Sequence, residues 1–176
     1  MVEDFKRWFV ELGDHAISRK NDIALKTGKR PKWKNSVKNK EIKEKFSHEG
    51  RRIEGLRPRP SSDRKAGEWL YDLIWREFDS KNNFVGVKLA MEIELSDMRE
   101  SGLVYDFNKL LQSDSDYKIF VFQQQTKEKA EYVFKQLRLR SESYNHKFKS
   151  TFLQCCWSWD SGAFLFNEID GQVRIS

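Results

Sequence analysis

The sequence predicts an α/β protein with a mixed central sheet flanked by helices. After about residue 66, segments with alternating or uniformly apolar residues, typical of strands, alternate with segments whose apolar residues recur every three or four positions, typical of helices. Aromatic residues make up 14% of the 176 residues, and such large rings supply the apolar surface of a packed core. At this length we expect one compact domain, with a basic helical and loop region over 1–65 and an α/β core over 66–176.

The N-terminal third is predicted to hold two helices joined by loops. Apolar residues at three- and four-residue spacing predict a helix over 4–19. A glycine and a proline make 20–40 a loop, with a short helix over 36–46. Two prolines and two serines make 55–67 a connector rather than an element of the sheet.

The middle of the chain is predicted to begin the sheet. Aromatic and aliphatic residues over 69–75 predict a strand. A turn at 81–83 and a second apolar segment over 85–95 predict an antiparallel partner for it. A short helix over 104–111 follows.

The last third alternates more clearly. The apolar run 118–122 predicts a strand that is buried on both faces. Thr126 is a candidate N-cap for a helix that ends near residue 143. The segments 152–159 and 163–169 flank a short turn and predict a terminal hairpin. The expected sheet is therefore mixed, with an antiparallel start.

Several classes of protein are excluded by composition. No apolar stretch approaches the roughly 20 residues of a membrane span, so no membrane partner is expected. The first residues carry acids and lack the apolar region of a secretory signal. Cys155 and Cys156 are adjacent, which is too few for a disulfide framework or a zinc site, and we expect both to pack in the core. These features predict a reducing, cytoplasmic setting.

Positive charge is concentrated in the N-terminal third. Residues 1–65 hold 19 Lys and Arg against 10 Asp and Glu, a balance of +9, whereas the remainder holds 14 against 17, a balance of −3. Such a segment is either a solvated surface arm or a site for a polyanion, whose phosphates it neutralises with release of counterions. Trp33 and Phe46 lie among these charges and could stack on bases. The candidate nucleic-acid contacts are Lys29, Arg30, Lys32, Lys34, Lys38, Lys40, Arg51 and Arg52.

Three acidic residues stand in the predicted strands. Asp72 lies among large apolar residues, and Glu92 and Glu94, two positions apart, project from the same face of their strand. Carboxylates are costly to bury unless they are paired or bind a cation. Converging carboxylates from neighbouring strands suit a hard divalent metal, Mg²⁺ or Mn²⁺. The alternative is that Asp72 pairs with an arginine while both glutamates face solvent.

This pattern resembles a known family. Asp72, followed one hairpin later by Glu92-Ile93-Glu94, is similar to the motif of the PD-(D/E)XK phosphodiesterase superfamily, which has the restriction-endonuclease-like fold. The similarity spans about residues 67–125 and includes Asp106-Phe-Asn-Lys-Leu-Leu111. It implies that Asp72 and Glu92 are the metal ligands, and that Glu94 stands where lysine is usual.

The glutamate at position 94 leaves the expected lysine to another element. Lys109, on the helix predicted after the second strand, could point back towards the acids, and Glu68 could serve as an auxiliary acid. The resemblance implies a Mg²⁺- or Mn²⁺-dependent nuclease with Asp72, Glu92, Glu94 and Lys109 as its catalytic residues. We expect a nucleic-acid partner, DNA rather than RNA, and leave homodimerisation open. The alternative is a catalytically degenerate protein of the same fold that binds nucleic acid or protein.

Overall fold

The computed structural model describes residues 1–61, 70–147 and 149–171 of the chain. Within these ranges, the helices are α1 (Val2–Thr27), α2 (Asn35–Arg51), α3 (Glu100–Leu111) and α4 (Lys127–Ser143). The strands are β1 (Leu56–Pro60), β2 (Leu73–Phe78), β3 (Phe84–Glu94), β4 (Tyr117–Gln124), β5 (Ser150–Ser158) and β6 (Ala163–Gly171). None of the described helices is long and apolar enough to cross a membrane.

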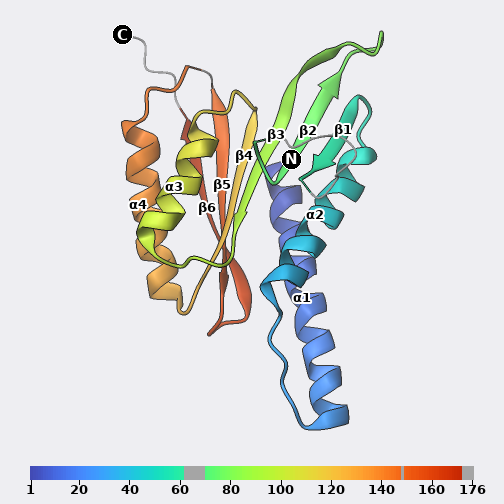
Figure 1. Cartoon of the computed structure of the whole chain (residues 1–176), viewed down its shortest axis with the longest axis vertical. Helices are drawn as coiled ribbons and strands as arrows, with labels where there is room; N and C mark the ends of the chain where they lie inside the picture. The colour runs from blue at the N-terminus through green and yellow to red at the C-terminus, as the bar shows by residue number, and fades with distance from the viewer. Residues whose placement is uncertain (62–69, 148, 172–176) are drawn as a thin grey trace.

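The strands form one mixed sheet in the order β1-β2-β3-β4-β5-β6. The first three strands are antiparallel, β3, β4 and β5 are parallel, and β6 returns antiparallel to β5. Helices α1 and α2 pack on one face, and α3 and α4 on the other (Figure 1). The predicted α/β class, with its mixed sheet and antiparallel start, is thus confirmed.

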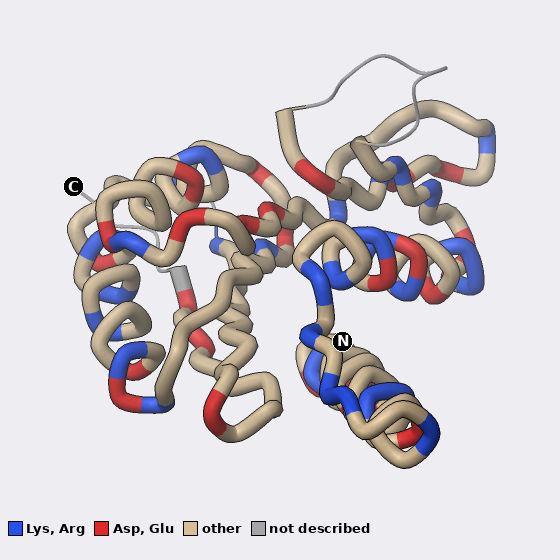
Figure 2. Tube along the Cα trace, turned by 60° about the horizontal axis from the view of Figure 1, so that its bottom comes forward, with Lys and Arg blue, Asp and Glu red and all other residues tan. Residues whose placement is uncertain are grey.

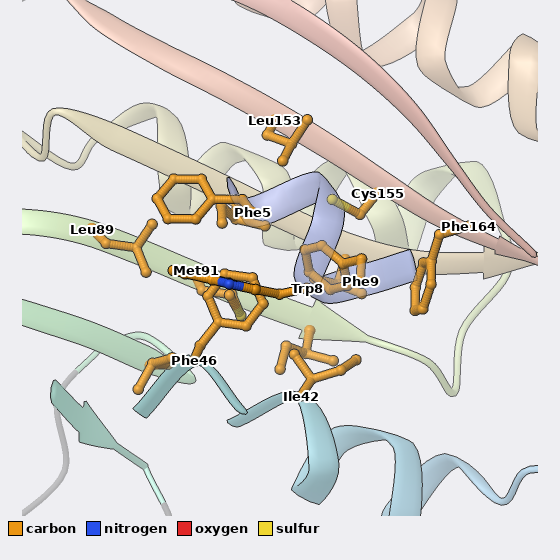
Figure 3. Close-up of a cluster of buried hydrophobic side chains, with 14 of the residues drawn as sticks. Phe5, Trp8, Phe9, Ile42, Phe46, Leu89, Met91, Leu153, Cys155 and Phe164 are labelled. Carbon is orange, nitrogen blue, oxygen red and sulfur yellow. The ribbon is translucent and has the colours of Figure 1, made fainter. Parts of the chain in front are cut away.

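An aromatic cluster joins α1 and α2 to their face of the sheet (Figure 3). The ring of Phe5 lies 5.7 Å from the rings of both Phe46 and Trp75. The ring of Phe9 lies 4.9 Å from those of Phe46 and Phe164. All five side chains are buried, and each such ring removes roughly 150–250 Å² from water. The N-terminal helices therefore share one core with strands from both halves of the sheet.

A second cluster joins α3 and α4 to the opposite face. The ring of Phe107 in α3 lies 5.6 Å from that of Phe120, and the ring of Phe134 in α4 lies 5.4 Å from that of Phe122. Because successive residues of β4 serve both clusters, all of this strand after Tyr117 is buried. This confirms the prediction of a strand buried on both faces.

The two cysteines occupy opposite faces of β5. Cys155 belongs to the cluster under α1 and α2, and Cys156 to the cluster under α3 and α4. Both thiols are free, and burial raises the pKa of each. They pack as core residues, as predicted.

The prediction of a connector over 55–67 is wrong in its first half, because β1 occupies Leu56–Pro60. This strand lies at the edge of the sheet and pairs with β2. Proline is tolerated at an edge because a strand there needs ladder hydrogen bonds on one side only. The two prolines that predicted a connector are thus compatible with an edge strand, and residues 62–67 lie outside the described part of the chain.

The sequence predicted that Asp72 lies in the middle of a strand, but the structure places Asp72 just before β2. Strand β2 begins at Leu73, which pairs with Pro60, the last residue of β1. Asp72 precedes this first pair, and its carbonyl oxygen accepts a hydrogen bond from the backbone N–H of Ser61 at 2.8 Å. Trp69, the predicted start of the strand, lies outside the described residues.

Helix boundaries also differ from the prediction. Helix α1 continues beyond residue 19 to Thr27, where Gly28 ends it with a φ of 69°. The last turns of α1 and the segment 28–34 extend past the end of the sheet (Figure 1). Helix α2 runs beyond 46 to Arg51, and α3 begins at Glu100, one turn earlier than expected. Thr126 caps α4 as predicted, accepting a hydrogen bond from the Lys129 N–H at 3.3 Å.

Candidate acidic site between β2 and β3

The antiparallel pairing of β2 and β3 brings two of the predicted acids together. Leu73 pairs with Met91, so continuing this register by one residue places Asp72 opposite Glu92. The negative charge of Asp72 contributes to the raised pKa of Glu92, as expected for neighbouring carboxylates. The two residues expected to hold a metal are therefore neighbours at one end of this strand pair, where Asp72 contacts Lys43 of α2 and Glu92 contacts Lys109 of α3.

Asp72 is held by three donors. Its Oδ1 lies 2.7 Å from Lys43 Nζ and accepts a hydrogen bond from Ser61 Oγ at 3.3 Å. Its Oδ2 accepts the backbone N–H of Ile93 at 3.0 Å. The side chain is 22% exposed. These contacts fix the carboxylate against β3 while leaving part of it in contact with solvent.

Glu92 is buried, with one oxygen paired and the other without a partner. Its Oε2 lies 3.2 Å from Lys109 Nζ. Its Oε1 has no hydrogen-bond partner among the described residues. Burial, opposed by the charge of Lys109, raises the pKa of Glu92 to about 7. A buried, unsatisfied carboxylate oxygen is costly, and a bound cation or water would relieve that cost.

Helix α3 carries Lys109 to the acids. Its Nζ lies between Glu92 Oε2 and Asp106 Oδ1, the latter at 2.9 Å. Burial opposes the charged form of this lysine, but the hydrogen bond that it donates to Asp106 and the charge of Glu92 outweigh burial, so the pKa of Lys109 is raised. Lys109 is therefore a cation that can hold a water or a phosphate oxygen beside Glu92.

Glu94 is engaged by the turn that follows β3. Its Oε1 accepts hydrogen bonds from the backbone N–H groups of Ser96 at 2.6 Å and of Asp97 at 2.7 Å, and also from the Ser96 hydroxyl at 2.6 Å. Burial acts to raise the pKa of Glu94, but these hydrogen bonds outweigh it and lower that pKa. Local hydrogen bonding thus accounts for Glu94 without a ligand, and a catalytic role for it stays a prediction.

The donor set fits a hard divalent cation with few protein ligands. In the described part of the chain no group of three or more His, Cys, Asp and Glu side chains could hold a metal. Mg²⁺, however, is commonly bound by one or two carboxylates together with waters and substrate phosphates. Asp72 and Glu92, with the unpartnered Oε1, supply such a pair.

Sequence reasoning missed Lys43 and Ser61. Lys43 Nζ contacts both Asp72 and the Ser61 hydroxyl, the latter at 2.9 Å. No local pattern could have identified Lys43, because it lies in α2, 29 residues before its acid partner. Glu68, the proposed auxiliary acid, lies outside the described residues.

The basic residues of the N-terminal third divide into two groups. Along α1 and α2, Lys and Arg alternate with Asp and Glu (Figure 2), and several are paired, such as Lys40 with Glu44 and Arg52 with Glu49. The segment 28–34 carries cations with no acidic residue between them. Its exposed basic residues are Lys29, Arg30, Lys32 and Lys34, and Arg51 is exposed at the end of α2.

Lys38 does not fit the predicted role of a phosphate contact, because it is 1% exposed. Its Nζ donates a hydrogen bond to Gln123 Oε1 at 2.9 Å and lies 5.1 Å from the ring centroids of both Trp33 and Trp157. Burial lowers the pKa of Lys38 to about 7. Helix α2 turns this side chain onto the ends of β4 and β5 rather than into solvent.

The aromatic residues expected to stack on bases are also used in packing. Phe46 is fully buried in the cluster under α1 and α2. Trp33 packs edge-on against Trp157 with ring centroids 5.0 Å apart, and its N–H donates to Glu41 Oε2 at 2.9 Å. Neither ring is presented for stacking on a base.

Comparison of the chain with protein-family models, curated proteins and solved structures gives no match.

Proposed function

We propose that the protein is a divalent-metal-dependent nuclease of the PD-(D/E)XK type, with its site at Asp72, Glu92 and Lys109. The observation that carries the proposal is the unpartnered Oε1 of buried Glu92, with a lysine at hydrogen-bond distance from its other oxygen and Asp72 as its neighbour in the register of β2 and β3. The mixed sheet with its antiparallel start is compatible with the restriction-endonuclease-like fold of the superfamily whose motif this sequence resembles.

Each residue has a distinct role in this proposal. Asp72 and Glu92 would hold Mg²⁺ or Mn²⁺, and the ion would supply a Lewis acid that lowers the pKa of a water and offsets charge on the phosphorus. Lys109 would orient the attacking water or donate to a phosphate oxygen, because it lies beside Glu92 and stays charged through Asp106. Hydrolysis would form a bond from the water oxygen to phosphorus and break the bond to the leaving oxygen of the nucleic acid.

The test combines metal binding with cleavage. Titration calorimetry with Mn²⁺ should show a site in the wild-type protein that is lost in Asp72→Asn and in Glu92→Gln, because one carboxylate alone holds the ion weakly. Cleavage of plasmid DNA or RNA should require Mg²⁺ or Mn²⁺, stop with a chelator and disappear in Asp72→Asn. Lys109→Ala should slow cleavage while Mn²⁺ still binds.

Asp116→Asn is a matched control, since Asp116 is an exposed acid paired with Lys88 outside this site. It should leave metal binding and cleavage unchanged. Retention of both Mn²⁺ binding and cleavage in Asp72→Asn would refute the proposed site.

A non-catalytic nucleic-acid- or protein-binding module is the second candidate. One observation favours it: each carboxylate already has a lysine partner, Lys43 for Asp72 and Lys109 for Glu92, so that neither requires a metal to balance its charge. Nucleic-acid binding that is unaffected by chelator, together with no detectable Mn²⁺ site, would support this candidate over the nuclease.

A further inference from the structure

Lys43 and Lys109 both pair with the candidate metal ligands, but they differ in the number of carboxylates that each contacts. Its Nζ lies 2.7 Å from Asp72 Oδ1, and its side chain is 11% exposed. Within the described part of the chain, Asp72 is the one carboxylate at ion-pair distance from this ammonium, and its other contact is the neutral hydroxyl of Ser61. Lys109, in contrast, lies between two carboxylates, Glu92 and Asp106.

This difference matters when a divalent cation approaches the acids. Lys109 keeps Asp106 as a partner if Glu92 turns to the metal. Lys43 has no second carboxylate among the described residues, so its charge would face the metal across Asp72 at short range. Two cations at such a distance repel strongly in a partly buried site. An anion that arrives with the metal, the phosphate of the substrate, would offset both charges.

We propose that Lys43 is an internal counter-ion that occupies the metal-binding position of Asp72 in the metal-free protein and passes to the substrate phosphate when a divalent metal binds. This inference rests on the proposed function. It assigns to α2 a direct part in the site: the helix that follows the basic segment 28–34 would supply a phosphate contact at the acids.

The inference predicts opposite effects of one substitution on two ligands. Lys43→Gln removes the competing charge but keeps a hydrogen-bond donor for Asp72. Mn²⁺ affinity, measured by calorimetry, should therefore increase about tenfold, which corresponds to about 1.4 kcal/mol. A short DNA duplex should bind about fivefold more weakly to Lys43→Gln in Ca²⁺, and with unchanged affinity in EDTA, where Asp72 holds the lysine.

Lys45→Gln is the matched control. Lys45 lies on the same helix and forms two ion pairs, with Glu11 at 2.7 Å and Glu49 at 3.0 Å, away from Asp72. It should change neither Mn²⁺ affinity nor the effect of Ca²⁺ on DNA binding. Lys43→Arg, which keeps the charge, should bind Mn²⁺ as the wild type does, and thermal melts check that each variant is folded.

The outcomes separate this inference from the proposed function. Mn²⁺ affinity that is unchanged or weaker in Lys43→Gln overturns the counter-ion role while leaving the nuclease site intact. An equal loss of DNA affinity with and without Ca²⁺ overturns the release of Lys43 to phosphate. Mn²⁺ binding by Lys43→Gln alone supports the counter-ion role of Lys43, overturns its transfer to phosphate in the wild type and favours the non-catalytic candidate. No Mn²⁺ binding by either protein refutes the metal site itself, and with it both proposals.

Discussion

Lys38 shows how far a single residue can depart from the charge pattern around it. It belongs to the most basic stretch of the sequence, yet its ammonium is enclosed by Trp33, Trp157 and Gln123. The cation–π contacts favour the charged form, whereas burial disfavours it and lowers the pKa to about 7. Lys38 therefore links the stability of the fold to pH.

We expect the free energy of unfolding to rise between about pH 7 and pH 10. The pKa of Lys38 is lowered from an ordinary 10.5, so within this window the unfolded chain binds one more proton than the folded chain. Stability then increases with pH by at most about 1.4 kcal/mol per unit, and the penalty is fully present below pH 7. Urea unfolding of the wild type and of Lys38→Met at pH 7, 8 and 9 gives the free energy of unfolding at each pH, and the two proteins are compared by how steeply it rises with pH.

The comparison with Lys38→Met isolates this lysine from Lys118, whose pKa burial also lowers, to about 8. The free energy of unfolding should rise less with pH in Lys38→Met than in the wild type, and the variant should be more stable than the wild type at pH 7. Lys45→Met, which removes an ion-paired lysine of the same helix, should keep the wild-type slope. Equal slopes in the wild type and Lys38→Met would show that Lys38 does not titrate in this range.

From the sequence, only those side chains of the candidate site that lie on the adjacent strands β2 and β3 could be placed near one another. The period of two in β3 puts Glu92 and Glu94 on one face, and the hairpin brings Asp72 to Glu92. Sequence could not show that Glu94 serves the next turn, that Lys43 reaches Asp72 from α2, or that Lys38 is buried. The last two depend on how α2 packs against the sheet, which no local pattern encodes, and the first depends on the conformation of the turn after β3.

At the scale of elements, β1 is held to the fold by a close contact with α2. A methyl group built on Gly50 would lie 2.6 Å from the Cγ of Pro58 and 2.7 Å from the ring of Trp75. Neither neighbour can easily yield, because Pro58 is a rigid ring in β1 and Trp75 is fully buried. The absence of a side chain at Gly50 therefore lets the helix lie directly on the edge of the sheet.

We expect Gly50→Ala to destabilise the protein by about 1–3 kcal/mol, the usual cost of overpacking, despite the better helix propensity of alanine. Gly86→Ala is the control, since a methyl group there meets no atom within 4 Å. Chemical unfolding measures both. A Gly50→Ala protein as stable as the wild type would mean that α2 and β1 can separate at little cost.

The elements that the sequence predicted well are those with strong local signals. Helix α4 has a capping threonine and a regular apolar stripe, and the hairpin of β5 and β6 has a short turn between apolar runs. Strand β1 was missed because its two prolines are equally typical of loops, and only its position at the edge explains them. The end of α1 was missed because residues after 19 stay helical without burying an apolar stripe.

At the scale of the whole molecule, the basic segment and the acids lie at the same end of β3. Asn35, where α2 begins, donates a hydrogen bond to the carbonyl of Leu95 at 2.6 Å, three residues beyond Glu92. Farther along α2, Lys43 reaches Asp72. The segment 28–34 thus joins the body near the candidate site, in a position to guide a polyanion towards it.

We expect this segment to supply much of the salt dependence of nucleic-acid binding. On duplex DNA, log K falls with log salt by about 0.9 for each phosphate neutralised. Replacing the four exposed cations Lys29, Arg30, Lys32 and Lys34 by alanine should therefore lower the slope by up to about 3.6 and weaken binding at low salt. Fluorescence anisotropy of a labelled duplex over a series of salt concentrations measures the slope.

The control replaces four exposed cations of α4, Lys127, Lys129, Lys135 and Arg140, so that the net charge changes equally. If net charge alone attracts DNA, the two quadruple variants should lose the same slope. If the segment 28–34 is the contact surface, the α4 variant should stay close to the wild type, because α4 lies on the other face of the sheet. Equal slopes in all three proteins would remove the segment from DNA binding and leave it as a solvated arm.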